Sequence, residues 1–136
     1  KVKRLGGKID RVLVDAPCSG FGTLRRNPDL KWRQTPDSVG EMRVKQASIL
    51  RAAAGLVKPG GRLVYATCSL LQGENEALVA GFASAHEDFK SLNCQDILAQ
   101  HGIAIDTGCQ LRLWPHVHAT DGFFGAVFTR VPRQGL

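Results

Sequence analysis

The feature that most constrains this chain is a pair of apolar, β-branched runs on either side of a segment with helical periodicity. The first run, Arg11 to Asp15, is followed by Pro17, and the second, Arg62 to Thr67, follows Pro59-Gly60-Gly61. Each run has the length and composition of a buried strand. A strand, a crossover helix and a second strand make a βαβ unit, in which the two strands are parallel. The sequence therefore predicts an α/β fold.

The segment between these runs carries the signals of one long helix. Thr35 supplies a capping hydroxyl, Pro36 suits the first helical position, and Asp37 places an acid in the first turn. Apolar residues then recur every three or four positions, and Lys58-Pro59-Gly60-Gly61 is expected to end the helix. Residues 18–34, before the helix, are predicted to form a functional loop with one short helical turn.

Downstream of the second run, the pattern predicts one more helix and three more strands. The helix is expected over residues 74–86, and the strands over residues 89–93, 110–114 and 122–130. Residues 94–109 are only weakly patterned. The aromatic residues of the last strand are expected in the core, and they are Phe123, Phe124 and Phe128.

The charge of the chain favours a polyanionic partner such as nucleic acid. Eighteen Lys and Arg residues against twelve Asp and Glu residues give a net charge of +6. A merely solvated basic face is the alternative explanation. Basic residues gather in the predicted loop after the first strand, which favours the first explanation, and they are Arg25, Arg26, Lys31 and Arg33.

Composition also indicates the kind of protein. The chain is 43% hydrophobic, as globular domains are, and has neither the roughly 18-residue apolar run of a membrane helix nor a signal region. We expect a cytoplasmic protein with no membrane partner. The cysteines lack C-x-x-C spacing and His116-x-His118 lacks further ligands, so we predict reduced thiols and no metal site. The chain starts at Lys1 and enters a strand almost at once, so we expect a piece of a longer protein.

Two cysteines follow the two predicted strands, in the sequences Pro17-Cys18-Ser19 and Thr67-Cys68-Ser69. Parallel strands end at the same edge of a sheet, and that edge is where α/β proteins bind ligands. A thiolate is a strong nucleophile, and its pKa falls beside cationic groups. Either cysteine alone is more simply explained as a small buried residue. The matched positions of both favour a catalytic pair.

Four motifs occur in order along the chain: Asp15-Ala-Pro-Cys-Ser-Gly20, the stretch Gly22 to Trp32, Ala66-Thr-Cys-Ser-Leu70, and Thr120-Asp-Gly-Phe-Phe124. They resemble the catalytic half of the RNA cytosine-5 methyltransferases, the Sun/Nop2 family, and most closely its bacterial small-subunit ribosomal RNA branch. The resemblance implies that residues 1–136 are the carboxyl-terminal portion of a single catalytic domain. The expected fold is half of a Rossmann-like, S-adenosylmethionine-dependent methyltransferase sheet, mostly parallel with an antiparallel strand near the carboxyl terminus.

The resemblance also implies roles for individual residues. Cys68 is expected to attack carbon 6 of a cytosine, so that carbon 5 can accept a methyl group from S-adenosylmethionine. Cys18 is expected to assist loss of the carbon 5 proton and release of the product. Asp15 is expected beside the methyl donor and the target base, as a catalytic and cofactor-binding residue, and capping of the next loop is its alternative role.

Ribosomal RNA is the partner that the resemblance implies, with a target base that must be flipped or unpaired to reach the thiols. The basic loop is expected to contact phosphates. Trp32 is expected either to stack on a base or to pack against the following helix. The sequence does not identify the target nucleotide.

The chain lacks the glycine-rich loop with which the family holds its methyl donor. Gly20-Phe-Gly22 lies in the catalytic loop, and Gly60-Gly61 precedes a strand, so neither is a substitute. We therefore expect the chain alone to be inactive and to bind the donor weakly or not at all. We also expect it either to self-associate through an unpaired strand edge or to be poorly stable. Two other functions stay open: a non-catalytic module that binds RNA or a partner, and an α/β enzyme that uses Cys18 alone in acyl or phosphoryl transfer.

Overall fold

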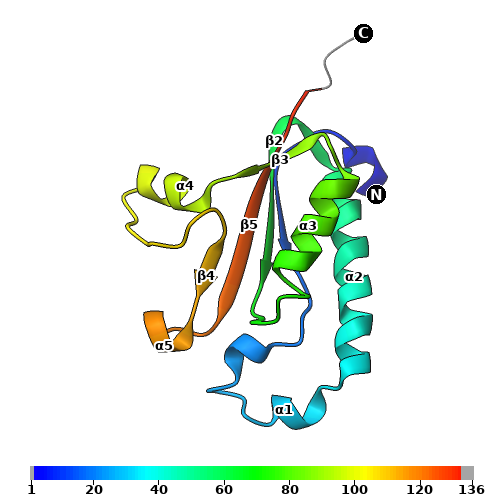
Figure 1. The fold of residues 1–136 in the computed structure, drawn as a ribbon. Coiled ribbons are helices and arrows are strands. Elements are labelled where there is room, and N and C mark those ends of the chain that lie inside the picture. The colour runs from blue at the N-terminus through cyan, green and yellow to red at the C-terminus, as the bar shows by residue number, and fades with distance from the viewer. Residues whose placement is uncertain (1, 133–136) are drawn as a thin grey trace.

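The computed structural model describes residues 2–132, and its centre is a five-stranded sheet (Figure 1). The strand order is β1-β2-β5-β3, and β4 pairs with the other half of the same edge of β5. β1 and β2 are parallel, whereas β5 is antiparallel to β2, β3 and β4. Four strands thus share a direction and β5 opposes them, as predicted. The strands are β1 (Ile9–Asp15), β2 (Val57–Thr67), β3 (Phe89–Leu92), β4 (Leu111–Leu113) and β5 (Phe123–Arg130).

Two helices cover one face of the sheet (Figure 1). α2 (Pro36–Ala54) packs on β1 and β2, and α3 (Glu76–Ala85) packs on α2 and β3. The predicted start of α2 is confirmed, because the Thr35 hydroxyl accepts a hydrogen bond from the Ser38 backbone N–H at 3.1 Å. The Ser38 hydroxyl oxygen in turn accepts from the Thr35 N–H at 2.8 Å, which completes a capping box.

The hydrophobic core lies between these helices and the sheet. Phe124 and Phe128 are fully buried, as predicted, whereas Phe123 is half-buried on the other face of the sheet. The Phe82 ring of α3 stands edge-on to Phe128, with 5.2 Å between the ring centroids, and edge-on to Phe89 at 5.5 Å. Such edge-to-face contacts fix the angle of α3 on the sheet in addition to the area they bury.

The junction between α2 and β2 differs from the sequence prediction. The helix ends at Ala54, and β2 begins at Val57, ahead of the glycines that were expected to end the helix. Val57 pairs with Ile9, yet the next matched pair is Arg62 with Arg11, so residues 58–61 bulge out of the ladder. Pro59 has no N–H to donate and Gly60 has a positive φ of 82°, and both properties suit a bulge.

The structure also contains helices that the pattern did not predict. α4 (Cys94–Gln100) lies in the weakly patterned stretch, and the Asn93 side chain caps it by accepting a hydrogen bond from the Asp96 N–H at 3.0 Å. The loop after β1 holds two helical turns instead of one, η2 (Phe21–Thr23) and α1 (Leu30–Arg33). The remaining short elements are η1 (Val2–Leu5) and α5 (Pro115–His118).

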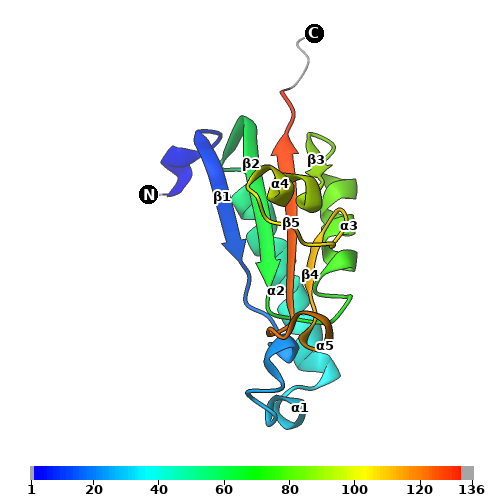
Figure 2. The ribbon, with the colours of Figure 1, turned by 90° about the vertical axis from the view of Figure 1, so that its left-hand side faces the viewer.

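The second face of the sheet is only partly covered. α4 packs on β5, and beside it lies an apolar groove of about 240 Å³ lined by Leu13, Val64 and Phe123 among others. Leu13 on β1 is 68% exposed. β1 forms one edge of the sheet, with β2 as its partner (Figure 2). Across residues 2–132, we find no helix with the length and apolar character needed to span a membrane.

Candidate active site

The two predicted cysteines lie together where β1 and β2 end. The Ala16 N–H donates to the Ala66 carbonyl at 2.9 Å, which is the last hydrogen bond between the two strands. Beyond it, both segments leave the sheet. The Sγ atoms of Cys18 and Cys68 are 3.2 Å apart, and both side chains are half-buried. The parallel register therefore brings two thiols from positions 50 residues apart into direct contact.

The surroundings of Cys18 favour the protonated form of its thiol. Burial, reinforced by the neighbouring Cys68, raises the pKa of Cys18 to about 12. Cys18 is consequently a protonated thiol at neutral pH. A thiol of this kind can donate a hydrogen bond or a proton to a neighbouring sulfur, but it is a poor nucleophile.

The raised pKa of Cys18 predicts a loss of stability in alkali. The folded thiol keeps its proton up to about pH 12, whereas the unfolded thiol releases it near pH 9.0, so stability present below pH 9 is lost as the pH rises toward 12. Burial raises the pKa of Tyr65 and of Cys94 as well, and both act in the same direction. Urea unfolding at several pH values between 8 and 11 measures this decline. The Cys18→Ala variant should show a shallower decline than the unmodified chain, and parallel curves would contradict the assignment.

Asp15 ends β1 with its side chain exposed. Within residues 2–132, no group hydrogen-bonds its carboxylate, so the alternative role of capping the next loop is not what the structure shows. Its neighbours in sequence, Val14 and Ala16, are buried against the helices, so the strand alternation directs Asp15 to the opposite side. The carboxylate is available to a ligand at the strand end.

The basic loop is tied to the segment before β5. Arg25 Nε lies 3.2 Å from Asp121 Oδ1, and Arg26 pairs with the other carboxylate oxygen. The two guanidinium groups, Arg26 foremost, hold the pKa of Asp121 below its ordinary value.

Backbone hydrogen bonds at Gly22 join the same loop to two other segments. The Gly22 N–H donates to the Cys68 carbonyl at 2.8 Å, and the Gly122 N–H donates to the Gly22 carbonyl at 2.7 Å. The second, third and fourth motifs therefore meet at one junction.

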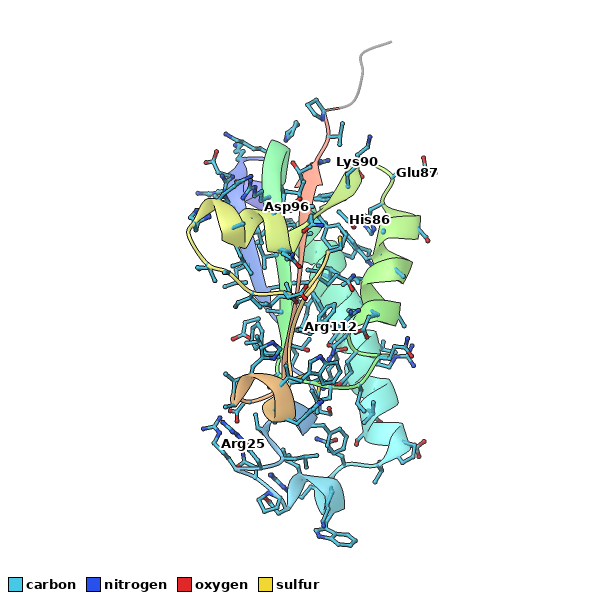
Figure 3. The ribbon with its side chains drawn as sticks, turned by 60° about the vertical axis from the view of Figure 1, so that its left-hand side comes forward. Arg25, His86, Glu87, Lys90, Asp96 and Arg112 are labelled. Carbon is cyan, nitrogen blue, oxygen red and sulfur yellow. The ribbon has the colours of Figure 1, made fainter. Side chains whose placement is uncertain are left out.

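The other predicted RNA-binding residues lie further along the loop. Arg33 pairs with Asp29 at 2.8 Å, and the Lys31 ammonium lies 5.0 Å from the centroid of the Trp32 ring. Trp32 is 80% exposed, so the expectation that it packs against the following helix is wrong. The loop lies at the end of the molecule where Arg25 is labelled, far from His86 and Lys90 at the opposite end (Figure 3).

Sequence reasoning missed a buried polar cluster directly behind the cysteines. Glu74 and Asn75 precede α3 rather than opening it, and both are buried. The Thr67 hydroxyl donates to Asn75 Oδ1 at 2.6 Å, and Asn75 Nδ2 donates to the Ser69 carbonyl at 2.8 Å. Gln46 of α2 is also fully buried in this cluster. The available signal was the acid–amide pair Glu74-Asn75 placed a few residues after Thr67-Cys68-Ser69.

The remaining cysteines and histidines lie outside this site. Cys94 is buried at the start of α4, and Cys109 is exposed. His118 Nδ1 accepts a hydrogen bond from the Trp114 backbone N–H at 3.0 Å, which stabilises the turn of α5. In the part of the chain that the structure describes, no three His, Cys, Asp or Glu side chains group as metal ligands.

Solved structures with the same fold identify its class. The chain matches the crystal structure of PH0851 with a TM-score of 0.82 at 40% identity, over 92% of this chain and 27% of that one. It matches NSun6 from Pyrococcus horikoshii, solved with SFG, with a TM-score of 0.72 at 27% identity, over 97% of this chain and 33% of that one. The fold is that of an α/β methyltransferase.

Sequence relatives narrow this class to one family. A probable ribosomal RNA small subunit methyltransferase B of Synechocystis sp. is 47% identical over 116 residues, which are 85% of this chain and 26% of that protein. The family model for 16S rRNA methyltransferase RsmB/F matches residues 1–129. The chain belongs to the 16S rRNA methyltransferase RsmB/F family, as the sequence motifs predicted. It spans about a quarter of the length of the curated relatives it matches.

Proposed function

We propose that the protein containing this chain methylates carbon 5 of a cytosine in small-subunit ribosomal RNA, and that the chain supplies the catalytic edge. The observation that carries the proposal is the 3.2 Å contact between Cys18 Sγ and Cys68 Sγ at the ends of two parallel strands. Membership of a ribosomal RNA methyltransferase family supports the substrate class and a cytoplasmic location. A reaction that needs both a nucleophile and a separate proton carrier accounts for two thiols in one place.

Carbon 5 of cytosine is a poor nucleophile, and Cys68 is proposed to activate it. Cys68 gives its proton to solvent and its Sγ bonds to carbon 6, while the electrons of the ring double bond move toward carbon 5, so that carbon 5 becomes nucleophilic. Asp15, exposed at the end of β1, is proposed to hydrogen-bond the polar edge of the ring. S-adenosylmethionine supplies an electrophilic methyl group when bound.

Cys18 is proposed to act in the release step. The bond between carbon 6 and Cys68 Sγ breaks as carbon 5 loses its proton, so that the ring double bond returns and the electrons of the broken bond return to the Cys68 sulfur. In the same step, Cys18 Sγ takes the carbon 5 proton while its own proton passes to Cys68 Sγ across the 3.2 Å contact. This exchange needs no free Cys18 thiolate, which suits a thiol whose raised pKa of about 12 keeps it protonated. Both thiols end the step protonated, so the protons balance.

The residues present fit the substrate side of this site and only one wall of a donor site. SFG, the ligand of the NSun6 structure, is an analogue of S-adenosylmethionine and supports that donor class. Asp15 is the carboxylate available to a donor at the strand end. Gly22 is enclosed by the Cys68 carbonyl and Gly122, so it leaves no room for a ligand against its backbone. We assign the rest of the donor site to parts of the longer protein outside residues 1–136.

RNA is proposed to bind along the loop between β1 and α2. The side chains of Arg25 and Arg26 are 47% and 65% exposed even while paired with Asp121, and the Trp32 ring is exposed beside Lys31. Guanidinium and ammonium groups suit phosphates, and an exposed indole suits stacking on an unpaired base. The proposed phosphate contacts are Arg25, Arg26, Lys31 and Arg33.

The test uses the full-length protein, labelled S-adenosylmethionine and unmodified 16S ribosomal RNA. We expect transfer of label to RNA and one new cytosine that resists bisulfite conversion, because methylation at carbon 5 slows that reaction. Residues 1–136 alone should transfer no label. Tight RNA binding without transfer by the full-length protein would favour a non-catalytic module, and a labelled base that converts normally would exclude carbon 5.

We also propose that the isolated chain self-associates through β1. Within the described residues β1 pairs only with β2, and Leu13 is 68% exposed beside the open edge. Unpaired strand edges are templates for pairing with another chain. Light scattering after size exclusion should give a mass above that of one chain, and Leu13→Lys should lower it. A monodisperse monomer at the same concentration would overturn the proposal.

A further inference from the structure

A buried carboxylate links the two cysteine loops. Ser19 follows Cys18 and Ser69 follows Cys68, and both serines are almost fully buried. The side chain of Glu74, which is 0% exposed, lies between them. The cysteine mechanism described above gives this glutamate no part.

Glu74 accepts four hydrogen bonds, three of which come from the two serines. Its Oε1 accepts from the Ser19 N–H at 2.8 Å and from Gln46 Nε2 at 3.3 Å. Its Oε2 accepts from the Ser19 hydroxyl at 2.7 Å and from the Ser69 hydroxyl. The two serine hydroxyl oxygens are 3.3 Å apart. One carboxylate therefore holds the residue after each cysteine.

The cluster is organised around the buried carboxyl group of Glu74. No lysine or arginine among residues 2–132 lies within 4 Å of the carboxylate, so the four donors are what offset its burial. The Gln46 amide is committed to the same purpose. Its Nε2 also donates to the Pro17 carbonyl at 2.7 Å, and its Oε1 is buried without a partner. An unsatisfied buried acceptor costs stability. In Gln46 this cost comes with an amide nitrogen that donates both to the Cys18 loop and to Glu74.

Glu74 itself is fixed to the central sheet. The buried Tyr65 hydroxyl, on β2, donates to the Glu74 backbone carbonyl at 2.7 Å. The Glu74 N–H donates to the Leu71 carbonyl at 3.1 Å. The backbone of Glu74 is thus held to β2, the strand that leads into Cys68. The Glu74 side chain therefore fixes the position of the Cys18 loop relative to β2.

We propose that Glu74 is a positioning residue that sets the separation of the Cys18 and Cys68 thiols by holding Ser19 and Ser69 together. The proposal rests on the proposed function in that both thiols must reach one base. Without the carboxylate, the Cys18 loop loses its two hydrogen bonds to Glu74, and the Cys68 loop loses the bond from Ser69. The sulfurs would then spend less time in contact, and the release step would suffer most.

The first readout is formation of a disulfide between Cys18 and Cys68, which requires no RNA or methyl donor. Diamide accepts the two electrons and two protons that the thiols lose as the sulfur–sulfur bond forms. In full-length protein, peptide mass spectrometry follows this bond with time. The Glu74→Gln substitution keeps the size of the side chain but turns one acceptor oxygen into a donor. We expect the disulfide to form about 10-fold more slowly and kcat for methyl transfer to fall by roughly 10- to 100-fold, with KM for RNA unchanged.

Matched variants separate positioning from general damage. Glu76→Gln removes a carboxylate two residues away, which pairs with Arg112 Nε at 2.6 Å instead of accepting hydrogen bonds from the two serines. It should form the disulfide at the unmodified rate. Ser19→Ala and Ser69→Ala each remove one hydroxyl donor at lower cost to folding than a change of Glu74. The double variant should slow disulfide formation by less than the product of the two single effects, because losing either hydroxyl already breaks the link between the two loops through Glu74.

The outcomes are distinguishable from those of the proposed function. Folded Glu74→Gln protein that closes the disulfide at the unmodified rate would overturn the positioning role. If the Glu74→Gln protein does not fold, the two serine variants provide the test. Disulfide formation in both of them at the rate of the unmodified protein would overturn the positioning role. The proposed function can fail separately. If the Glu74 or serine variants form the disulfide slowly but a Cys68→Ala protein transfers methyl groups normally, the positioning role holds and the proposed cysteine mechanism is wrong.

Discussion

Replacing Cys68 by alanine in the full-length protein should reduce methyl transfer to RNA by about 10³-fold or more, to the background of the assay. The reason is chemical, because the Cys68 sulfur is the atom proposed to bond to carbon 6. Cys18, 3.2 Å away, is held as a thiol by its raised pKa of about 12. Labelled methyl transfer to ribosomal RNA under single-turnover conditions measures the effect. Normal methylation by the variant would show that the proposed mechanism is wrong.

The Cys18→Ala variant should behave differently, because attack by Cys68 does not need the second thiol. We expect the adduct with RNA to form and to persist, so that a protein–RNA band survives denaturing electrophoresis. Loss of the proton carrier accounts for the stalled release. Cys109→Ala is the matched control, since Cys109 is exposed and lies outside the site. An adduct that accumulates equally in the Cys109→Ala variant would contradict a specific role for Cys18.

Replacing Gly22 by alanine should be the most damaging change that leaves every chemical group in place. A Cβ at Gly22 would lie 2.5 Å from the Cys68 carbonyl oxygen and would also collide with the Gly122 carbonyl. Both are backbone atoms, so neither can rotate away. We expect a loss of about 1–3 kcal/mol in the free energy of unfolding, as for an overpacked core. Activity should fall further, because relief of the clash moves the loop that carries Cys18 away from Cys68.

Gly40→Ala provides the matched control for that experiment. Gly40 lies within α2, and a Cβ added there meets nothing within 4 Å. Alanine favours the helix over glycine by about 0.5–1 kcal/mol, so this variant should be slightly more stable than the unmodified chain. Urea unfolding of the two variants side by side gives the comparison. Equal stability of the two variants would show that the junction at Gly22 has more room than its geometry indicates.

The parts of the structure that sequence predicted are those that local signals determine. The βαβ unit follows from two apolar runs and a capped helix, and its parallel register is what brings Cys18 to Cys68. Local signals are weaker for α4, a helix of seven residues whose only clear mark is the Asn93 cap. The local signals gave a wrong helix end at Pro59-Gly60, because the residues that commonly end a helix also suit a bulge inside a strand.

The parts that sequence did not predict depend on pairs far apart in the chain. Arg25 was identified for its charge, but its partner Asp121 is 96 residues away and could be found only from the fold. Glu74 was assigned to a helix because the apolar periodicity begins just after it. Its burial depends on Ser19, 55 residues earlier, whose backbone and hydroxyl supply donors that no local pattern shows.

The position of β5 has a consequence for how the protein is made. This strand is the last of the sheet in the chain, yet it lies between β2 and the pair β3 and β4, and holds them together. During synthesis, the sheet therefore stays open until residues near 130 have left the ribosome. Asp121 and Gly122, which fasten the arginine loop, emerge just before them. The cysteine edge is thus assembled late, and until then the chain exposes unpaired strands that are prone to aggregation.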